Sequence, residues 1–142
     1  MKNILFLCTG NSCRSQMAEG WGNHLFGDRY TFFSAGTKKH GLNPLAVQVM
    51  REVGVNISEY KSKTLDEIST QVDLIVTVCS DAKKNCPYIP GVKLIHCGFD
   101  DPPKLARELE DKIEIHRVYA RVRDEIKSMV ESLPLKIAEE FK

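Results

Sequence analysis

Short apolar runs alternate with amphipathic segments along most of this 142-residue chain, and few folds accept such a pattern. Continuous apolar or β-branched runs predict strands at residues 2–8, 30–35, 72–79 and 92–96, as expected for strands covered on both faces. Apolar spacings of three or four residues predict helices at 15–26, 43–52 and 105–132, with a short one at 65–68. We therefore predict a single α/β domain over residues 1–142, a four-stranded parallel sheet with helices on both faces.

Two of these helices carry distinct signals. Asn43 precedes Pro44, and a capping side chain before a proline is typical of a helix N-terminus. The segment from Leu105 to about Ser132 is predicted as one continuous amphipathic helix. Its apolar residues recur mostly every three or four positions: Leu105, Leu109, Ile113, Val118, Val122, Ile126, Met129, Val130 and Leu133.

The charge balance excludes several classes of protein. Lys plus Arg is 20 and Asp plus Glu is 19, so the net charge of +1 favours neither a nucleic-acid nor a membrane partner. The run from Ile4 to Cys8 is too short to span a bilayer, and the N-terminus lacks a signal-peptide pattern. We expect a cytoplasmic monomer. In that reducing compartment the five cysteines are expected to be chemically active rather than structural.

The segment Cys-Thr-Gly-Asn-Ser-Cys-Arg-Ser, residues 8–15, joins the first strand to the first helix. Successive backbone N–H groups before a helix N-terminus favour an anion, and Arg14 can hold two oxygens of phosphate or arsenate. These surroundings are expected to lower the pKa of Cys8 and make it a nucleophile. The predicted oxyanion-binding residues are Thr9, Gly10, Asn11, Ser12, Cys13, Arg14 and Ser15.

Two residues of this loop have further expected roles. We expect Ser15 to donate a hydrogen bond to the Cys8 thiolate and to cap the helix. Cys13 is either a small buried residue behind the loop or a redox partner of Cys8.

The stretch CTGNSCRSQMAEG, from Cys8 to Gly20, resembles the phosphate-binding loop of low-molecular-weight protein tyrosine phosphatases. It is more closely similar to the thioredoxin-coupled arsenate reductases built on that fold, and the resemblance covers nearly the whole chain. It implies that Cys8 attacks arsenate and that Cys79 attacks the adduct, which releases arsenite. Cys86 would then form a disulfide with Cys79 for thioredoxin to reduce. We expect no tightly bound cofactor; a monovalent cation near Asn11, Glu19 and Ser34, as in some relatives, is left open.

The spacing of Cys79 and Cys86 has a physical consequence. Disulfide geometry needs Cα atoms within about 7 Å, whereas seven helical residues rise about 10 Å, so residues 80–89 must loop or unwind. Buried structural thiols are one alternative and a metal site is another. Zinc-binding cysteines are usually two to four positions apart, and only His96 and Cys97 lie nearby, so no metal is predicted. Cys97 is expected to pack at a strand end.

Asp101 lies immediately before Pro102, where the resemblance implies the general acid that protonates the departing oxygen. Asp100, if close, would raise the pKa of the pair and keep a proton available. The alternative is a turn, since Asp before Pro commonly begins a loop. Phosphatases carry aromatic residues after this proline, whereas Pro103 and Lys104 follow here, which favours a smaller inorganic substrate. None of the scattered histidines is predicted to be catalytic: His24, His40, His96 and His116.

Three functions therefore compete. The first, which we favour, is an arsenate reductase that uses Cys8, Cys79 and Cys86, with arsenate and thioredoxin as partners. The second is a low-molecular-weight protein tyrosine phosphatase that uses Cys8, Arg14 and Asp101. The third is a non-catalytic thiol sensor, which would give Arg14 and Asp101 no role.

Overall fold

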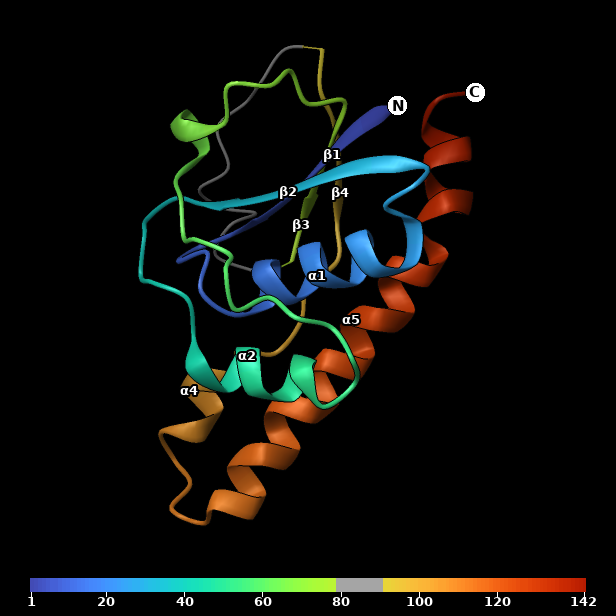
Figure 1. Cartoon of the computed structure of the whole chain (residues 1–142). Helices are drawn as coiled ribbons and strands as arrows, with labels where there is room; N and C mark the ends of the chain where they lie inside the picture. Colours follow the sequence, from blue (N-terminus) through green and yellow to red (C-terminus); the bar gives the residue numbers. More distant parts are fainter. Residues whose placement is uncertain (79–90) are drawn as a thin grey trace.

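A computed structural model describes residues 1–78 and 91–142 of the chain (Figure 1). Its strands are β1 (Lys2–Cys8), β2 (Tyr30–Gly36), β3 (Leu74–Thr77) and β4 (Lys93–His96). They form one four-stranded sheet in the order β2-β1-β3-β4, and each pair is parallel. The predicted α/β class and the four-stranded parallel sheet are confirmed.

Among the described residues the helices are α1 (Arg14–Phe26), α2 (Pro44–Arg51), α4 (Pro102–Ala106) and α5 (Lys112–Glu140), with a 3₁₀ turn, η1 (Leu65–Glu67). Asn43 caps α2 as predicted, since its Oδ1 accepts from the N–H groups of Leu45 (2.8 Å) and Ala46 (3.3 Å). We predicted helices on both faces of the sheet. In the described structure α5 contacts α1, α2 and α4, and α1 contacts α2 (Figure 1). These contacts do not decide how the helices divide between the two faces.

The prediction of one continuous helix over 105–132 is wrong. The chain forms the short α4, leaves helical geometry, and starts α5 at Lys112, where the Asp111 carboxylate caps the helix by accepting from Ile113 N–H (2.9 Å). At its other end α5 continues through Pro134 to Glu140. Burial of Leu133 and Ile137 favours that extension and outweighs the hydrogen bond that proline removes.

The sheet brings the ends of its strands to one edge. The register pairs Cys8 with Gly36, Leu7 with Thr77, and Thr77 with His96. The strand order reverses direction beside β1, and ligands of open α/β sheets bind at such a point beyond the carboxyl ends of the strands. Cys8 therefore lies at the position where this fold class binds ligands.

Cys79, Cys86 and the predicted loop at 80–89 lie outside the described residues. No helix within residues 1–78 and 91–142 has both the length and the apolar character that crossing a membrane requires.

Candidate active site

The loop between β1 and α1 is held from the outside. The carbonyl oxygens of residues 8–12 all accept hydrogen bonds from beyond the loop. The donors are the backbone N–H groups of Thr37, Lys38, His40 and Asn43, the Gln16 amide, and the hydroxyls of Thr37 and Ser62. Because the N–H and C=O groups of a trans peptide point in opposite directions, we infer that the N–H groups of the loop face its concave side. That arrangement suits a tetrahedral oxyanion.

Two residues allow the chain to follow this tight course. Asn11 has a φ of 48°, in the left-handed region where asparagine is among the better tolerated side chains. At Gly36, an added Cβ would lie 2.6 Å from the Thr9 carbonyl oxygen and 2.8 Å from Asn11 N. Only glycine therefore lets the end of β2 approach the loop so closely.

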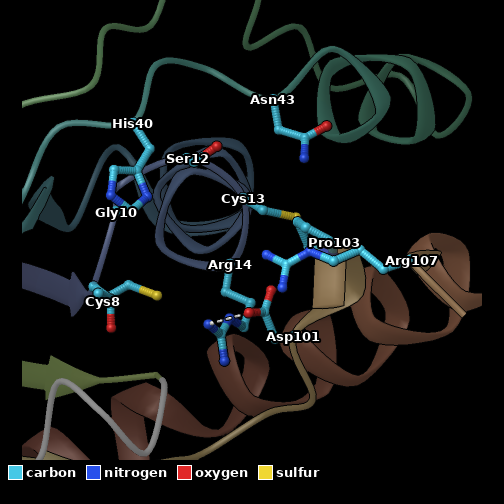
Figure 2. A pocket seen from close by; sticks show the side chains of 11 residues that line it. Cys8, Gly10, Ser12, Cys13, Arg14, His40, Asn43, Asp101, Pro103 and Arg107 are labelled. Carbon is cyan, nitrogen blue, oxygen red and sulfur yellow. Dashed lines mark ion pairs between the residues drawn. The ribbon is translucent and has the colours of Figure 1, made fainter. Parts of the chain in front are cut away.

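A cavity of about 300 Å³ opens beside the loop (Figure 2). Its volume is at the lower end of the range for ligand pockets, about 300–1,000 Å³, and suits a small ligand. Its lining residues come from the loop, the β2–α2 connection and the α4 region: Cys8, Thr9, Gly10, Ser12, Cys13, Arg14, His40, Asn43, Asp101, Pro103 and Arg107. Of the residues predicted to bind the oxyanion, Asn11 and Ser15 are not among them.

Arg14 connects the loop to the segment that follows β4. Its side chain is 10% exposed, and its Nη1 donates to the Phe99 carbonyl (3.0 Å). Its Nη2 lies 3.6 Å from Asp101 Oδ2, and both side chains line the cavity (Figure 2). Asp101 precedes α4, yet its side chain makes no capping hydrogen bond. Its carboxylate is thus directed to Arg14 and the cavity, as a role in chemistry requires, rather than to the turn.

Asp100 points elsewhere. Its carboxylate accepts a hydrogen bond from Arg121 Nη2 on α5 (3.0 Å), and its side chain is 60% exposed. Hydrogen bonds to Asp100 and Glu125 raise the pKa of Arg121, which keeps this guanidinium charged. The expected cooperation between Asp100 and Asp101 therefore finds no support, because Asp100 is absent from the cavity lining.

Ser15 does not cap α1, so that prediction is wrong. The residue at the cap position is Cys13, which makes no side-chain capping bond, and Ser15 lies buried inside the helix. Its hydroxyl oxygen accepts a hydrogen bond from Asn11 Nδ2 (2.9 Å). Donation from Ser15 to Cys8 stays a prediction.

Cys13 is 4% exposed. Burial raises the pKa of its thiol far above the ordinary value, although Arg14 acts in the opposite direction. A redox partner must form a thiolate, which this environment disfavours. The structure therefore supports the interpretation of Cys13 as a small buried residue.

Four lining residues were not predicted as site residues: His40, Asn43, Pro103 and Arg107. His40 packs over Gly10, where any Cβ would clash with its ring, and Asn43 donates from Nδ2 to the Tyr119 hydroxyl (3.1 Å). Both residues follow β2. Because the carboxyl ends of parallel strands meet at one edge of the sheet, their place near the site could have been predicted from the sequence. Arg107 lies between α4 and α5. It was missed because the prediction of one continuous helix over 105–132 placed it inside that helix.

Cys97 and His96, which were considered as possible metal ligands, are not among the residues that line the cavity. Cys97 is partly buried and accepts a hydrogen bond from Lys136 Nζ (3.7 Å), while His96 Nδ1 is hydrogen-bonded to the Thr77 hydroxyl (2.6 Å). Within the part of the chain that the structure describes, no three His, Cys, Asp or Glu side chains gather in a way that could hold a metal ion.

Known proteins share both the sequence and the fold. Residues 3–142 match the family described as low molecular weight phosphotyrosine protein phosphatase. Arsenate reductase 2 of Staphylococcus epidermidis is 50% identical over 133 residues, which cover 92% of this chain and 95% of that protein.

Two solved structures extend the comparison. One, described as an arsenate reductase in the oxidized state, has a TM-score of 0.79 at 28% identity and covers 96% of this chain and 99% of its own. A thioredoxin-dependent arsenate reductase of Corynebacterium glutamicum has a TM-score of 0.67 at 28% identity, with 96% of this chain and 63% of that chain covered.

The chain therefore belongs to the low molecular weight phosphotyrosine protein phosphatase family. The two solved structures and the relative at 50% identity are all described as arsenate reductases.

Proposed function

We propose that this protein is an arsenate reductase that transfers electrons through Cys8, Cys79 and Cys86 and is recycled by thioredoxin. The observation that carries the proposal is the shared cavity of Cys8, Arg14 and Asp101 at the carboxyl edge of the sheet. The names of the relatives supply the substrate and the reductant, arsenate and thioredoxin.

The first step joins sulfur to arsenic. The Cys8 thiolate attacks As(V) while the loop N–H groups and Arg14 hold the remaining oxygens. One As–O bond breaks, and Asp101 supplies a proton so that the oxygen leaves as water. Proton transfer of this kind contributes about 10²–10⁴ to a rate.

The second step reduces arsenic. The Cys79 thiolate attacks Cys8 Sγ, the S–As bond breaks, and its electron pair stays on arsenic, which becomes As(III). Val78, the last described residue before Cys79, donates its N–H to the carbonyl of Leu7, which precedes Cys8 (3.0 Å). Cys86 then attacks Cys79 and releases the Cys8 thiolate, and a dithiol of thioredoxin reduces the Cys79–Cys86 disulfide.

The phosphatase alternative uses the same Cys8, Arg14 and Asp101, and family membership supports residual phosphatase activity. The cavity favours the smaller substrate. Among the described residues that line it there is no Phe, Tyr or Trp to stack on a phenol ring, and Pro103 and Arg107 lie at its α4 side. A small, cationic cavity suits an inorganic oxyanion better than a phosphotyrosyl side chain.

A coupled assay tests the proposal. NADPH oxidation is followed with arsenate, thioredoxin and thioredoxin reductase, and hydrolysis of a small aryl phosphate is measured in parallel. We expect sustained NADPH consumption that needs both arsenate and thioredoxin. Aryl phosphate hydrolysis with no arsenate-dependent NADPH oxidation would instead establish the phosphatase.

A Cys86→Ser variant tests the relay itself. Cys8 and Cys79 remain, so one arsenite per protein should form before turnover stops, with a Cys8–Cys79 disulfide trapped. Peptide mapping after denaturation and thiol blocking identifies that bond. Multiple turnovers, or a trapped disulfide without Cys79, would exclude the relay.

A further inference from the structure

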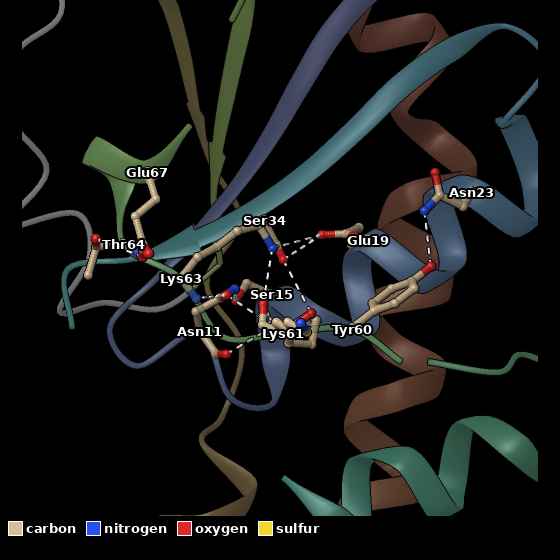
Figure 3. A network of polar contacts seen from close by, with 11 residues as sticks. Asn11, Ser15, Glu19, Asn23, Ser34, Tyr60, Lys61, Lys63, Thr64 and Glu67 are labelled. Carbon is tan, nitrogen blue, oxygen red and sulfur yellow. Dashed lines mark hydrogen bonds and ion pairs between the residues drawn. The ribbon is translucent and has the colours of Figure 1, made fainter. Parts of the chain in front are cut away.

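On the side of the loop that faces away from the cavity, polar side chains form a connected network (Figure 3). Glu19, on α1, accepts a hydrogen bond from the Ser34 hydroxyl (2.6 Å). Lys63 Nζ lies 3.8 Å from the same carboxylate oxygen and donates to the Lys61 carbonyl (3.1 Å). A fixed positive charge is therefore placed among oxygen atoms behind the loop.

The site left open for a monovalent cation, near Asn11, Glu19 and Ser34, lies in this network. Asn11 Oδ1 already accepts from Gln16 Nε2 (3.0 Å) and from the backbone N–H of Lys63 (2.8 Å). Both lone pairs of that oxygen are thus used by N–H donors. The arrangement does not fit a cation that needs Asn11 as a ligand.

The Glu19 carboxylate needs a cation nearby all the same. Its side chain is 13% exposed, and a buried charge is costly unless it is paired. Burial raises the pKa of Glu19, while the hydrogen bond from Ser34 and the charge of Lys63 act against that rise. Lys63, 27% exposed, is the cation that the structure supplies.

We propose that the Lys63 ammonium group takes the place of a bound monovalent cation, so that the loop is held in its anion-binding form without one. Lys63 is a positioning residue. Its side chain pairs with Glu19, its N–H binds Asn11, and its carbonyl accepts from Gly36 N–H at the end of β2 (2.8 Å). One residue thereby joins the buried carboxylate to the loop and to the strand beside it.

The test compares thermal unfolding and phosphate binding in potassium, sodium and choline chloride at one ionic strength. Neither readout requires arsenate reduction, so the result is independent of the proposed function. Wild type is expected to show the same Tm and the same phosphate Kd in all three salts. Lys61→Met is the matched control, since it removes a nearby exposed lysine but keeps the backbone carbonyl that Lys63 contacts.

Lys63→Met keeps most of the length of the side chain and removes its charge. In choline chloride its Tm should fall by about 3–5 °C, and its phosphate Kd should rise about 3–10-fold. Potassium or sodium should restore both in a saturable manner, because the vacated position beside Glu19 then accepts a free cation. In the double variant Glu19→Gln/Lys63→Met, the dependence on cations should disappear.

Three results would overturn the proposal. The first is a saturable stabilisation of the wild type by potassium. The second is a Lys63→Met variant that equals the wild type in every salt. The third is a Lys63→Met variant that is weakened but restored by no cation, since a purely structural role for the side chain predicts that outcome.

Discussion

The two sides of the loop at residues 8–15 differ in how completely their polar groups are used. On the cavity side, Arg14 is held at one nitrogen by Phe99 and faces Asp101 at 3.6 Å. On the opposite side, Asn11 uses its amide oxygen twice and its amide nitrogen once, all within the protein. On the side opposite the cavity, the Asn11 side chain is thus committed to hydrogen bonds within the protein, whereas the cavity side keeps hydrogen-bonding capacity for a ligand.

This contrast separates two kinds of variant. Changes on the cavity side should alter chemistry and leave the fold intact, because ligand contacts are not needed for folding. Changes on the opposite side should alter stability first and activity through it, since they leave buried polar groups unpaired.

The largest effect is expected for Cys8→Ser. A hydroxyl with a far higher pKa than a thiol cannot attack arsenic at neutral pH, so arsenate turnover should fall by more than about 1,000-fold. Aryl phosphate hydrolysis should disappear with it, while Tm changes little. Activity above a few per cent in either assay would remove Cys8 from the role of nucleophile.

Asp101→Asn should lower kcat about 100-fold or more and leave the phosphate Kd nearly unchanged, because the proton is needed in the transition state rather than for binding. Asp100→Asn is the matched control. That neighbouring carboxylate is exposed and paired with Arg121, so kcat should stay within about 2-fold of wild type. Equal losses in the two variants would refute the distinction drawn between them.

On the opposite side, Asn11→Ala should lower the free energy of unfolding by about 2–4 kcal/mol, because it leaves buried donors and acceptors unpaired. Asn11→Gly should lower it by about 1 kcal/mol less, since glycine accepts the φ of 48° that alanine resists. Urea unfolding of the three proteins measures both differences. If alanine and glycine were equivalent, the backbone conformation would contribute nothing to the loss.

The smallest effect is expected at the cavity mouth. Arg107→Ala should raise KM for arsenate about 2–3-fold with kcat unchanged, and the difference should shrink as salt is added. Arg117→Ala is the control, because Arg117 is exposed on α5 and is not among the cavity residues. A fall in kcat for Arg107→Ala would instead give this arginine a part in the chemistry.

Sequence patterns were most informative where one physical cause dominates. β1 was predicted with its observed bounds, because an apolar run that ends in a glycine-containing loop has few alternatives. Helix polarity and the chemistry of guanidinium predicted Arg14 as a site residue, and Arg14 lines the cavity; that it binds an anion stays a prediction. The helix break at Asp111 was missed because Leu105 and Leu109 continue the apolar spacing by chance, while the cap that starts α5 depends on one local carboxylate.

Tertiary contacts account for the rest. Nothing in the local sequence indicates that Asp100 turns to Arg121, twenty-one positions away. Likewise, the contact between Lys63 and Glu19 depends on how the segment after α2 returns to the sheet.

The outward hydrogen bonds of the loop carbonyls also set the order in which a binding site can arise during synthesis. Residues 8–15 leave the ribosome early, yet their carbonyl partners extend to residue 43 through the backbone and to Ser62 through its hydroxyl. These long-range hydrogen bonds cannot form until the later segments have been synthesised. Bringing the segments together costs chain entropy before the contacts stabilise the loop. A nascent chain that contains the whole loop, but ends before residue 62, should therefore hold Cys8 without the anion site that activates it.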